Sequence, residues 1–235
     1  MDYSTAVVTG AASGIGRALA VRLAKAGTRL VLADVRAEPL AAVAVELNAT
    51  AVPTDVADLG AVQALADAAP DADLICLNAG IVGSLGAPWD IPVAEWDAVF
   101  AVNVGGVLNG LRAFVPSLLA SGRQANILIT ASLAGLAGFG GIGAYGPSKH
   151  TVVAIAEQAA LALADSAISV TVLCPALVKT GMSEIGDDPL DVADAAIAAT
   201  KRGEFVITPP EWHGAIVRRA ERFVAGQQPT SASPG

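Results

Sequence analysis

Short β-branched runs alternate along this chain with Ala/Leu-rich stretches of helical character. The expected strands are 5–10, 29–34, 50–55, 73–78, 125–132, 168–175 and 204–209, and the expected helices are 15–26, 37–47, 58–68, 95–120, 146–165, 189–201 and 211–225. Strands that alternate with helices form βαβ units, and nearly all-apolar strands indicate a sheet that is covered on both faces. The pattern predicts an α/β fold with a doubly wound parallel sheet of about seven strands between two helical layers.

The composition favours one globular domain. Hydrophobic residues make up 54% of the 235 residues and charged residues 15%, which is enough apolar material for a wide buried sheet. We expect a single domain over 1–225 and a flexible tail over the polar, Pro/Ser-rich residues 226–235.

The net charge, the N-terminus and the cysteine positions argue against several classes of partner. A net charge of −8 disfavours nucleic-acid binding, because phosphate backbones are repelled. The N-terminus has no leader-like run, so a cytoplasmic protein without membrane association is expected. Cys76 and Cys174 have no metal-ligand spacing, so no metal site is expected.

A glycine-rich turn joins the first strand to the first helix. Gly10, Gly14 and Gly16 stand in VVTGAASGIGRALA, where missing side chains let backbone N–H groups approach a pyrophosphate at the helix N-terminus. The spacing differs from the common dinucleotide fingerprint, and a turn that needs glycine only for packing is the alternative.

Asp34 ends the second expected strand. An acid at this point accepts hydrogen bonds from adenosine ribose hydroxyls and repels a 2′-phosphate, so it favours NAD over NADP. Arg36 lies near enough to soften this preference. A helix-capping role for Asp34 is the structural alternative.

Seven motifs in order over residues 5–208 resemble those of the short-chain dehydrogenases/reductases in their compact single-domain form. They are TGAASGIG (9–16), DV (55–56), NAG (78–80), NVGG (103–106), ITAS (129–132), YGPSK (145–149) and CPALVKT (174–180). The resemblance implies a Rossmann-like fold. Two departures from the family pattern are Pro175-Ala176, where Pro-Gly is frequent, and a short substrate-covering segment at about 182–188.

The resemblance also implies functional residues. The catalytic set is Asn103, Ser132, Tyr145 and Lys149. The cofactor contacts are Gly10, Ser13, Gly14, Ile15, Gly16, Asp34, Asp55, Val56, Asn78, Ala79, Gly80, Tyr145, Lys149, Pro175, Val178 and Thr180. The expected substrate contacts are Ser132, Ala134, Phe139, Ile142, Tyr145 and Met182, with 134–144 as an apolar wall of the site.

The spacing of Tyr145 and Lys149 suits proton transfer. Positions i and i+4 share one face of a helix, so both side chains can point into one cleft. A phenol has an ordinary pKa of about 10, and a nearby ammonium group lowers it by favouring the phenolate. Ser132 would hydrogen-bond the substrate oxygen, and the resemblance gives Asn103 a water-mediated relay from Lys149 to solvent.

These features predict an NAD-dependent short-chain alcohol dehydrogenase or carbonyl reductase that acts on a secondary alcohol or ketone. The alternatives are an NADPH-dependent 3-oxoacyl-thioester reductase and a non-catalytic NAD-binding regulator. The family resemblance further implies a homo-oligomer, a homotetramer or else a dimer.

Overall fold

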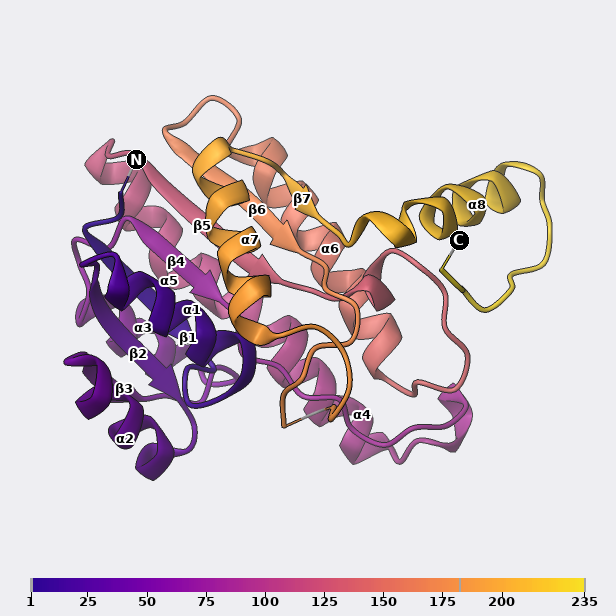
Figure 1. Cartoon of the computed structure of the whole chain (residues 1–235), viewed down its shortest axis with the longest axis horizontal. Helices are drawn as coiled ribbons and strands as arrows, with labels where there is room; N and C mark the ends of the chain where they lie inside the picture. Colours follow the sequence, from indigo (N-terminus) through magenta and orange to yellow (C-terminus); the bar gives the residue numbers. More distant parts are fainter. Residues whose placement is uncertain (1, 182, 235) are drawn as a thin grey trace.

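The computed structural model describes residues 2–181 and 183–234 of the chain (Figure 1). Seven parallel strands form one sheet in the order β3-β2-β1-β4-β5-β6-β7. They are β1 Thr5–Thr9, β2 Arg29–Asp34, β3 Thr50–Pro53, β4 Leu74–Leu77, β5 Ala125–Thr130, β6 Ile168–Leu173 and β7 Val206–Ile207. The predicted strands and their parallel pairing are therefore confirmed.

Helices connect the strands. They are α1 Gly14–Lys25, α2 Ala37–Leu47, α3 Leu59–Asp67, α4 Val93–Phe100, α5 Gly106–Ser121, α6 Tyr145–Ala162, α7 Pro189–Arg202 and α8 His213–Val224. Short turns of 3-10 helix are η1 Pro88–Asp90, η3 Leu133–Gly135 and η4 Pro210–Trp212, and η2 Ala101–Gly105 is a π-helical turn.

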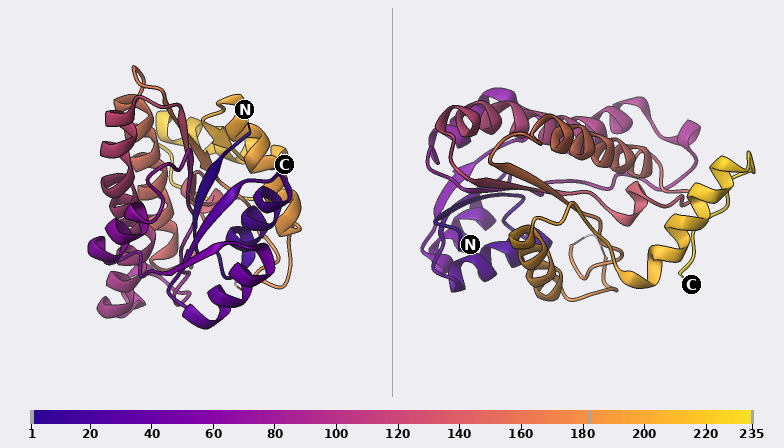
Figure 2. Two further views of the ribbon diagram at one scale, coloured as in Figure 1. Left: turned by 90° about the vertical axis from the view of Figure 1, so that its left-hand side faces the viewer. Right: turned by 90° about the horizontal axis from the view of Figure 1, so that it is seen from above.

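The sheet lies between two helical layers, as seen edge-on in Figure 2. Successive strand residues point to opposite faces, so β1 places Val7 in the core shared with α3, α5 and α6, and Val8 in the core shared with α1, α2 and α7. The three-layer α/β/α arrangement is as predicted. It also explains why the strands are almost entirely apolar.

The strand order places a crevice between β1 and β4. The chain runs from β1 to β2 and β3 on one side of β1, and then crosses to β4 on the other side. In open α/β sheets, ligands bind at such a switch point, outside the carboxyl ends of the strands. The expected glycine turn and NAG motif follow strands that end at this edge, and the ITAS motif spans the end of a third.

One predicted helix differs from the structure. The stretch 95–120 was expected to be continuous, but the π turn η2 separates α4 from α5. A π turn inserts an extra residue into the helical repeat and turns side chains by a fraction of a turn, often at functional sites. Here it contains Asn103, which is buried.

The whole stretch Val93–Ser121 is apolar and long enough to span a membrane by length and composition alone. Its buried residues, among them Val107, Phe114 and Leu118, belong to the core under the sheet. Packing within the domain therefore accounts for the apolar residues on the buried side of this stretch.

The C-terminal part of the chain extends beyond the sheet. After β7 the chain forms η4 and α8, and α8 projects from the body of the domain (Figures 1 and 2). Residues 226–234, the predicted tail, run back along α8, and the N–H of Ala232 donates to the carbonyl of Gly138 at 2.7 Å.

Candidate active site

The glycine turn after β1 is closely packed. Gly10 and Gly14 have φ angles of +67° and +54°, which L side chains rarely adopt. A Cβ atom on Gly16 would lie 2.2 Å from the carbonyl oxygen of Gly10, so only glycine fits there. The turn therefore keeps its backbone N–H groups accessible at the start of α1, as a pyrophosphate site requires.

Polar side chains tie the ends of three strands together beside this turn. The backbone N–H groups of Asn78 and Ala79 donate to Thr9 Oγ1 at 2.9 and 3.1 Å. The Asn78 side chain donates to the Thr9 carbonyl at 3.1 Å and accepts from Thr130 Oγ1 at 3.0 Å. These contacts hold the NAG segment, including Gly80, over the crevice. We did not select Thr9 or Thr130 from sequence, although each is the polar last residue of an apolar strand.

Asp34 lies at the end of β2 and is only 7% exposed. Its Oδ2 accepts from the Ala12 N–H at 3.1 Å, which links it to the glycine turn. Arg36 donates to Oδ1 through its backbone N–H at 3.0 Å and its Nε at 3.1 Å, and its Nη2 contacts Ser13 Oγ at 2.9 Å. Burial opposes ionisation, but the hydrogen bonds from Arg36 and Ala12 outweigh it and lower the pKa of Asp34.

Ser132, Tyr145 and Lys149 come together past the carboxyl end of β5. Ser132 is the N-cap of η3, and its Oγ accepts from the Ala134 N–H at 3.1 Å. Tyr145 is the first residue of α6, and Lys149 Nζ lies 5.7 Å from the centre of its ring, on the same helix face. Lys149 is only 4% exposed, and its ammonium donates to the Thr130 carbonyl at 3.0 Å.

The protein surroundings shift the pKa values of both helix residues. Burial raises the pKa of Tyr145, and a hydrogen bond with Ser132 offsets this only in part. Burial lowers the pKa of Lys149 to about 8. Lys149 was expected to lower the pKa of Tyr145, together with a bound nicotinamide, and within the protein alone burial outweighs that effect. The physical reason is that desolvation of the phenolate dominates, while the ammonium is directed at Thr130.

Asn103 joins the crevice from the π turn. Its Oδ1 accepts from the Ile81 N–H at 2.8 Å, and its Nδ2 donates to the Ile81 carbonyl at 2.9 Å and to Ser148 Oγ at 3.0 Å. A Cβ atom on Gly80 would lie 3.1 Å from Asn103 Oδ1 and 3.3 Å from Lys149 Nζ. Asn103 and Lys149 therefore face the same small space. Ser148 was not selected from sequence.

Comparison with known proteins shows which family has this fold and these motifs. The family model for short chain dehydrogenases matches residues 4–189. The chain belongs to the short-chain dehydrogenase family.

Two relatives and one solved structure show what this short-chain dehydrogenase is similar to. The chain is 46% identical over 193 residues to 1-deoxy-11-beta-hydroxypentalenate dehydrogenase of Streptomyces avermitilis, covering 78% of this chain and 72% of that protein. It is 34% identical over 243 residues to 3beta-hydroxysteroid dehydrogenase 2 of Eggerthella lenta, covering 95% and 88%. A short-chain dehydrogenase/reductase of Burkholderia phymatum, solved in complex with NAD, has a TM-score of 0.92 and 33% identity, covering 100% and 99%.

Family membership establishes the class of reaction. The protein is an oxidoreductase that exchanges a hydride between a nicotinamide cofactor and a small-molecule alcohol or ketone. The residues at the crevice fit such a cofactor, because the glycine positions leave room for it and Asp34 reaches the edge where an adenosine ribose would lie.

The other predicted cofactor residues of this dehydrogenase line the same edge. Ser13 precedes α1 as its N-cap and Ile15 lies in the first turn of that helix. Val56 is buried beside Gly106, while the exposed Asp55 accepts from the Ala57 N–H at 2.9 Å. Beyond β6, the Pro175 carbonyl accepts from Leu133 N–H at 2.8 Å, Val178 is bridged to Asp187, and Thr180 lies against Gly14.

The predicted substrate contacts are partly placed. Ala134 is buried in η3, directly after Ser132. Ile142 pairs with Gly86 through a short parallel bridge, and Phe139 packs edge-on against Trp212 with ring centres 5.7 Å apart. Met182 lies outside the described residues.

The segment that would cover the substrate folds back on the preceding loop. Asp187 exchanges backbone hydrogen bonds with Leu177 and Lys179, both at 2.9 Å, and Thr180 pairs with Ser183. A Cβ atom on Gly186 would lie 2.0 Å from the Leu177 carbonyl oxygen, so this short cover needs glycine. It holds Thr180 beside the glycine turn.

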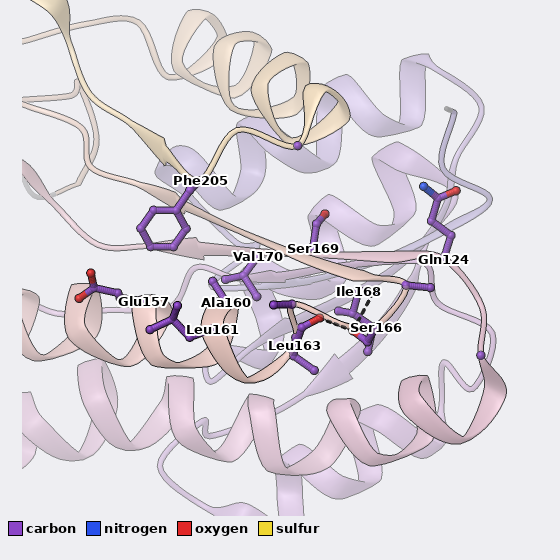
Figure 3. A pocket seen from close by; sticks show the side chains of 14 residues that line it. Gln124, Glu157, Ala160, Leu161, Leu163, Ser166, Ile168, Ser169, Val170 and Phe205 are labelled. Carbon is purple, nitrogen blue, oxygen red and sulfur yellow. Dashed lines mark hydrogen bonds between the residues drawn. The ribbon is translucent and has the colours of Figure 1, made fainter.

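A pocket of about 880 Å³ opens at the opposite edge of the sheet (Figure 3). It lies at the amino end of β6, between the end of α6 and β7, and its lining includes Glu157, Leu161, Ser166, Ile168 and Phe205. None of the predicted catalytic residues lines it. A smaller pocket of about 340 Å³ reaches the glycine turn and includes Gly14 and Thr180. Among the described residues, no group of three or more His, Cys, Asp or Glu is placed to hold a metal ion.

Proposed function

We propose that Tyr145 is the general acid and base of a secondary-alcohol dehydrogenase that uses NAD(H). The observation that carries this proposal is the convergence of Tyr145, Ser132 and the buried Lys149 at the carboxyl end of β5, next to the crevice for the cofactor. When bound, the nicotinamide ring accepts the hydride in alcohol oxidation and supplies it in ketone reduction.

In oxidation, the substrate hydroxyl lies between Ser132 and Tyr145. Ser132 donates a hydrogen bond to the substrate oxygen, and η3 fixes its position because Oγ also accepts from the Ala134 N–H. Tyr145 removes the hydroxyl proton, and in the reverse direction it returns a proton to the alkoxide. Such proton transfer typically contributes about 10²–10⁴-fold to the rate.

Lys149 and Asn103 support this transfer. The ammonium of Lys149 is a buried positive charge beside the phenol and favours its ionised form, and a bound oxidised nicotinamide would add a second positive charge. With a pKa of about 8, Lys149 can itself exchange a proton near neutral pH. Asn103 shapes the space at Gly80 where a water molecule would connect Lys149 to solvent.

Asp34 supports NAD as the preferred dinucleotide. Its carboxylate is held at the glycine turn by Ala12 and has a lowered pKa, so it stays ionised and repels a 2′-phosphate. Arg36 currently occupies both of its oxygens, since Nη2 also lies 3.3 Å from Oδ2. Ribose hydroxyls therefore have to displace or share this guanidinium, which moderates the preference.

A bulky alicyclic alcohol is the substrate class we favour. The relatives named above are dehydrogenases of a hydroxypentalenate and of a hydroxysteroid, and the wall segment 134–144 is apolar. A homotetramer or dimer in the cytoplasm also stays a prediction, which light scattering and cell fractionation would test.

A panel of secondary alcohols with NAD⁺ and with NADP⁺ tests the function. Oxidation of an alicyclic alcohol with NAD⁺ as the better cofactor is expected. Tyr145→Phe should reduce turnover by about 10²–10⁴-fold. Tyr3→Phe is the matched control, because Tyr3 is the other of the two tyrosines and is buried away from the crevice.

Three outcomes would contradict the proposal. Substantial turnover by Tyr145→Phe would refute the assigned proton transfer. Faster reaction with NADPH and a 3-oxoacyl thioester would favour the reductase alternative. Tight NADH binding without turnover of any alcohol, ketone or thioester would favour the non-catalytic regulator.

A further inference from the structure

The last part of the chain forms a C-terminal arm, which we define as residues 210–234. It comprises η4, α8 and the returning tail. The family model matches the chain only as far as residue 189, so the arm lies beyond the part that the family model describes. In Figures 1 and 2 the arm projects from the domain, and its tail returns toward the base of α8.

The arm is organised by its own contacts. The N–H of Gln227 donates to the Arg222 carbonyl at 2.9 Å and reverses the chain after α8. Arg218 Nη2 donates to the Ser233 carbonyl at 3.0 Å and fastens the tail to the helix. The tail is therefore positioned by α8 and not only by its attachment at residue 225.

The arm contacts the wall segment (134–144) at two adjacent residues. The ring of Trp212 in η4 packs against Phe139 at an interplanar angle of 62°. The Ala232 N–H donates to the Gly138 carbonyl at 2.7 Å, and the Thr230 carbonyl lies 3.9 Å from the position of a Gly138 Cβ atom. Both ends of the arm therefore hold the same point of the wall.

The wall has a second attachment on its other side. The Gly86 N–H donates to the Gly141 carbonyl at 2.9 Å, and the Gly143 N–H donates to the Gly86 carbonyl at 3.0 Å. The wall connects Ser132 to Tyr145, and it contains four glycines between residues 138 and 143. Glycine-rich backbone is conformationally permissive, so these external contacts decide its position.

We propose that the C-terminal arm is a specificity-determining element, which positions Phe139 against the substrate through Trp212 and Ala232. This inference rests on the proposed function of the site. The arm contains none of the groups assigned to proton transfer or to the cofactor. Loosening it therefore changes how the wall fits a bulky substrate, and leaves the chemical step and the dinucleotide site intact.

The test compares two proline substitutions in the tail. Ala232→Pro removes the N–H that binds Gly138, whereas Ser231→Pro is the matched control, because the Ser231 N–H makes no hydrogen bond within the described residues. Trp212→Ala removes the second contact independently. Backbone hydrogen exchange in 134–144 is measured on the full-length proteins without substrate. Kinetics are measured with borneol, a bulky alicyclic alcohol, and with isopropanol, and NADH affinity is measured by fluorescence.

Loss of one hydrogen bond should raise exchange in the wall about three- to tenfold in Ala232→Pro, with little change in Ser231→Pro. The KM for borneol should rise by a similar factor, while the KM for isopropanol and the NADH affinity stay within about twofold. Trp212→Ala should act in the same direction.

Two results would overturn the inference. Exchange in 134–144 that is the same in Ala232→Pro and Ser231→Pro would show that the arm does not hold the wall. Raised exchange with an unchanged ratio of the two KM values would show that the wall position does not select the substrate. The exchange measurement needs no turnover. It therefore tests the contact between the arm and the wall even if no alcohol is oxidised and the proposed function fails.

Discussion

Replacing Asn103 by leucine should destabilise the protein, because a single amide satisfies three polar groups in the crevice. Leucine has a similar volume, so the substitution removes hydrogen bonds with little change in packing. The Ile81 N–H, the Ile81 carbonyl and the Ser148 hydroxyl each lose a partner, and Asn103 itself is only 1% exposed.

The magnitude follows from these contacts. An unsatisfied donor costs about 1–3 kcal/mol, and each of the two lost bonds to acceptors contributes about 0.5–1.5 kcal/mol, for a range of about 2–6 kcal/mol. Ile81 is 39% exposed, so water can replace part of what is lost. We therefore expect the lower part of that range, about 2–4 kcal/mol, which corresponds to a fall in Tm of at least about 4 °C.

Urea unfolding of wild type and Asn103→Leu measures this difference in the free energy of unfolding, provided that the two proteins have the same m value. Gln63→Leu is the control, since Gln63 is an exposed amide with one long contact to Asp67 at 3.4 Å, and its replacement should stay within about 0.5 kcal/mol. A loss below about 1 kcal/mol for Asn103→Leu would refute the view that this amide organises the crevice. NADH affinity should fall as well, because Ile81 anchors the segment that carries Gly80.

Two further predictions concern the glycine turn and the buried lysine. Gly16→Ala should abolish measurable NADH binding and lower the free energy of unfolding by about 1–3 kcal/mol, because a Cβ atom there would overlap the Gly10 carbonyl. Gly181→Ala is the control and should do neither, since Gly181 has open space around it. Equal behaviour of the two variants would show that close packing at Gly16 is not what matters. Burial lowers the pKa of Lys149 to about 8 from 10.5, so its favourable contribution to stability is present above pH 10.5 and is lost as the pH falls through 8. Between pH 7 and 10, the free energy of unfolding of wild type should rise by about 2–3 kcal/mol relative to Lys149→Met, as measured by urea titration at each pH. If the difference between the two proteins is the same at every pH, Lys149 has an ordinary pKa.

The positions of nearly all strands and helices could be predicted from the sequence. The reason is that β-branched runs, Ala/Leu-rich runs and glycine turns act over a few residues, and a buried parallel sheet tolerates only apolar strands. Pro147 illustrates this local control. It lies in the first turn of α6, where its missing N–H has no partner to lose.

The π turn at Asn103 could not be predicted from local sequence. The motif that contains Asn103 was recognised by resemblance, but the helix 95–120 was expected to be regular. The π turn that turns its amide toward Ile81 and Ser148 is stabilised by those contacts, which join residues 22 and 45 positions apart. The periodicity of the helix sequence contains no information about these distant contacts.

The electrostatics of the site also depend on the folded surroundings. The four-residue spacing of Tyr145 and Lys149 places both on one helix face, and this follows from sequence alone. Burial then raises the pKa of the phenol and lowers that of the ammonium, because desolvation depends on all the groups packed around them. Local pattern thus determines the order of elements, the sheet and the residues that reach its carboxyl edge. Tertiary packing decides the π turn, the pKa shifts and the contact of the C-terminal arm with the wall, since each arises from atoms that are distant in the chain.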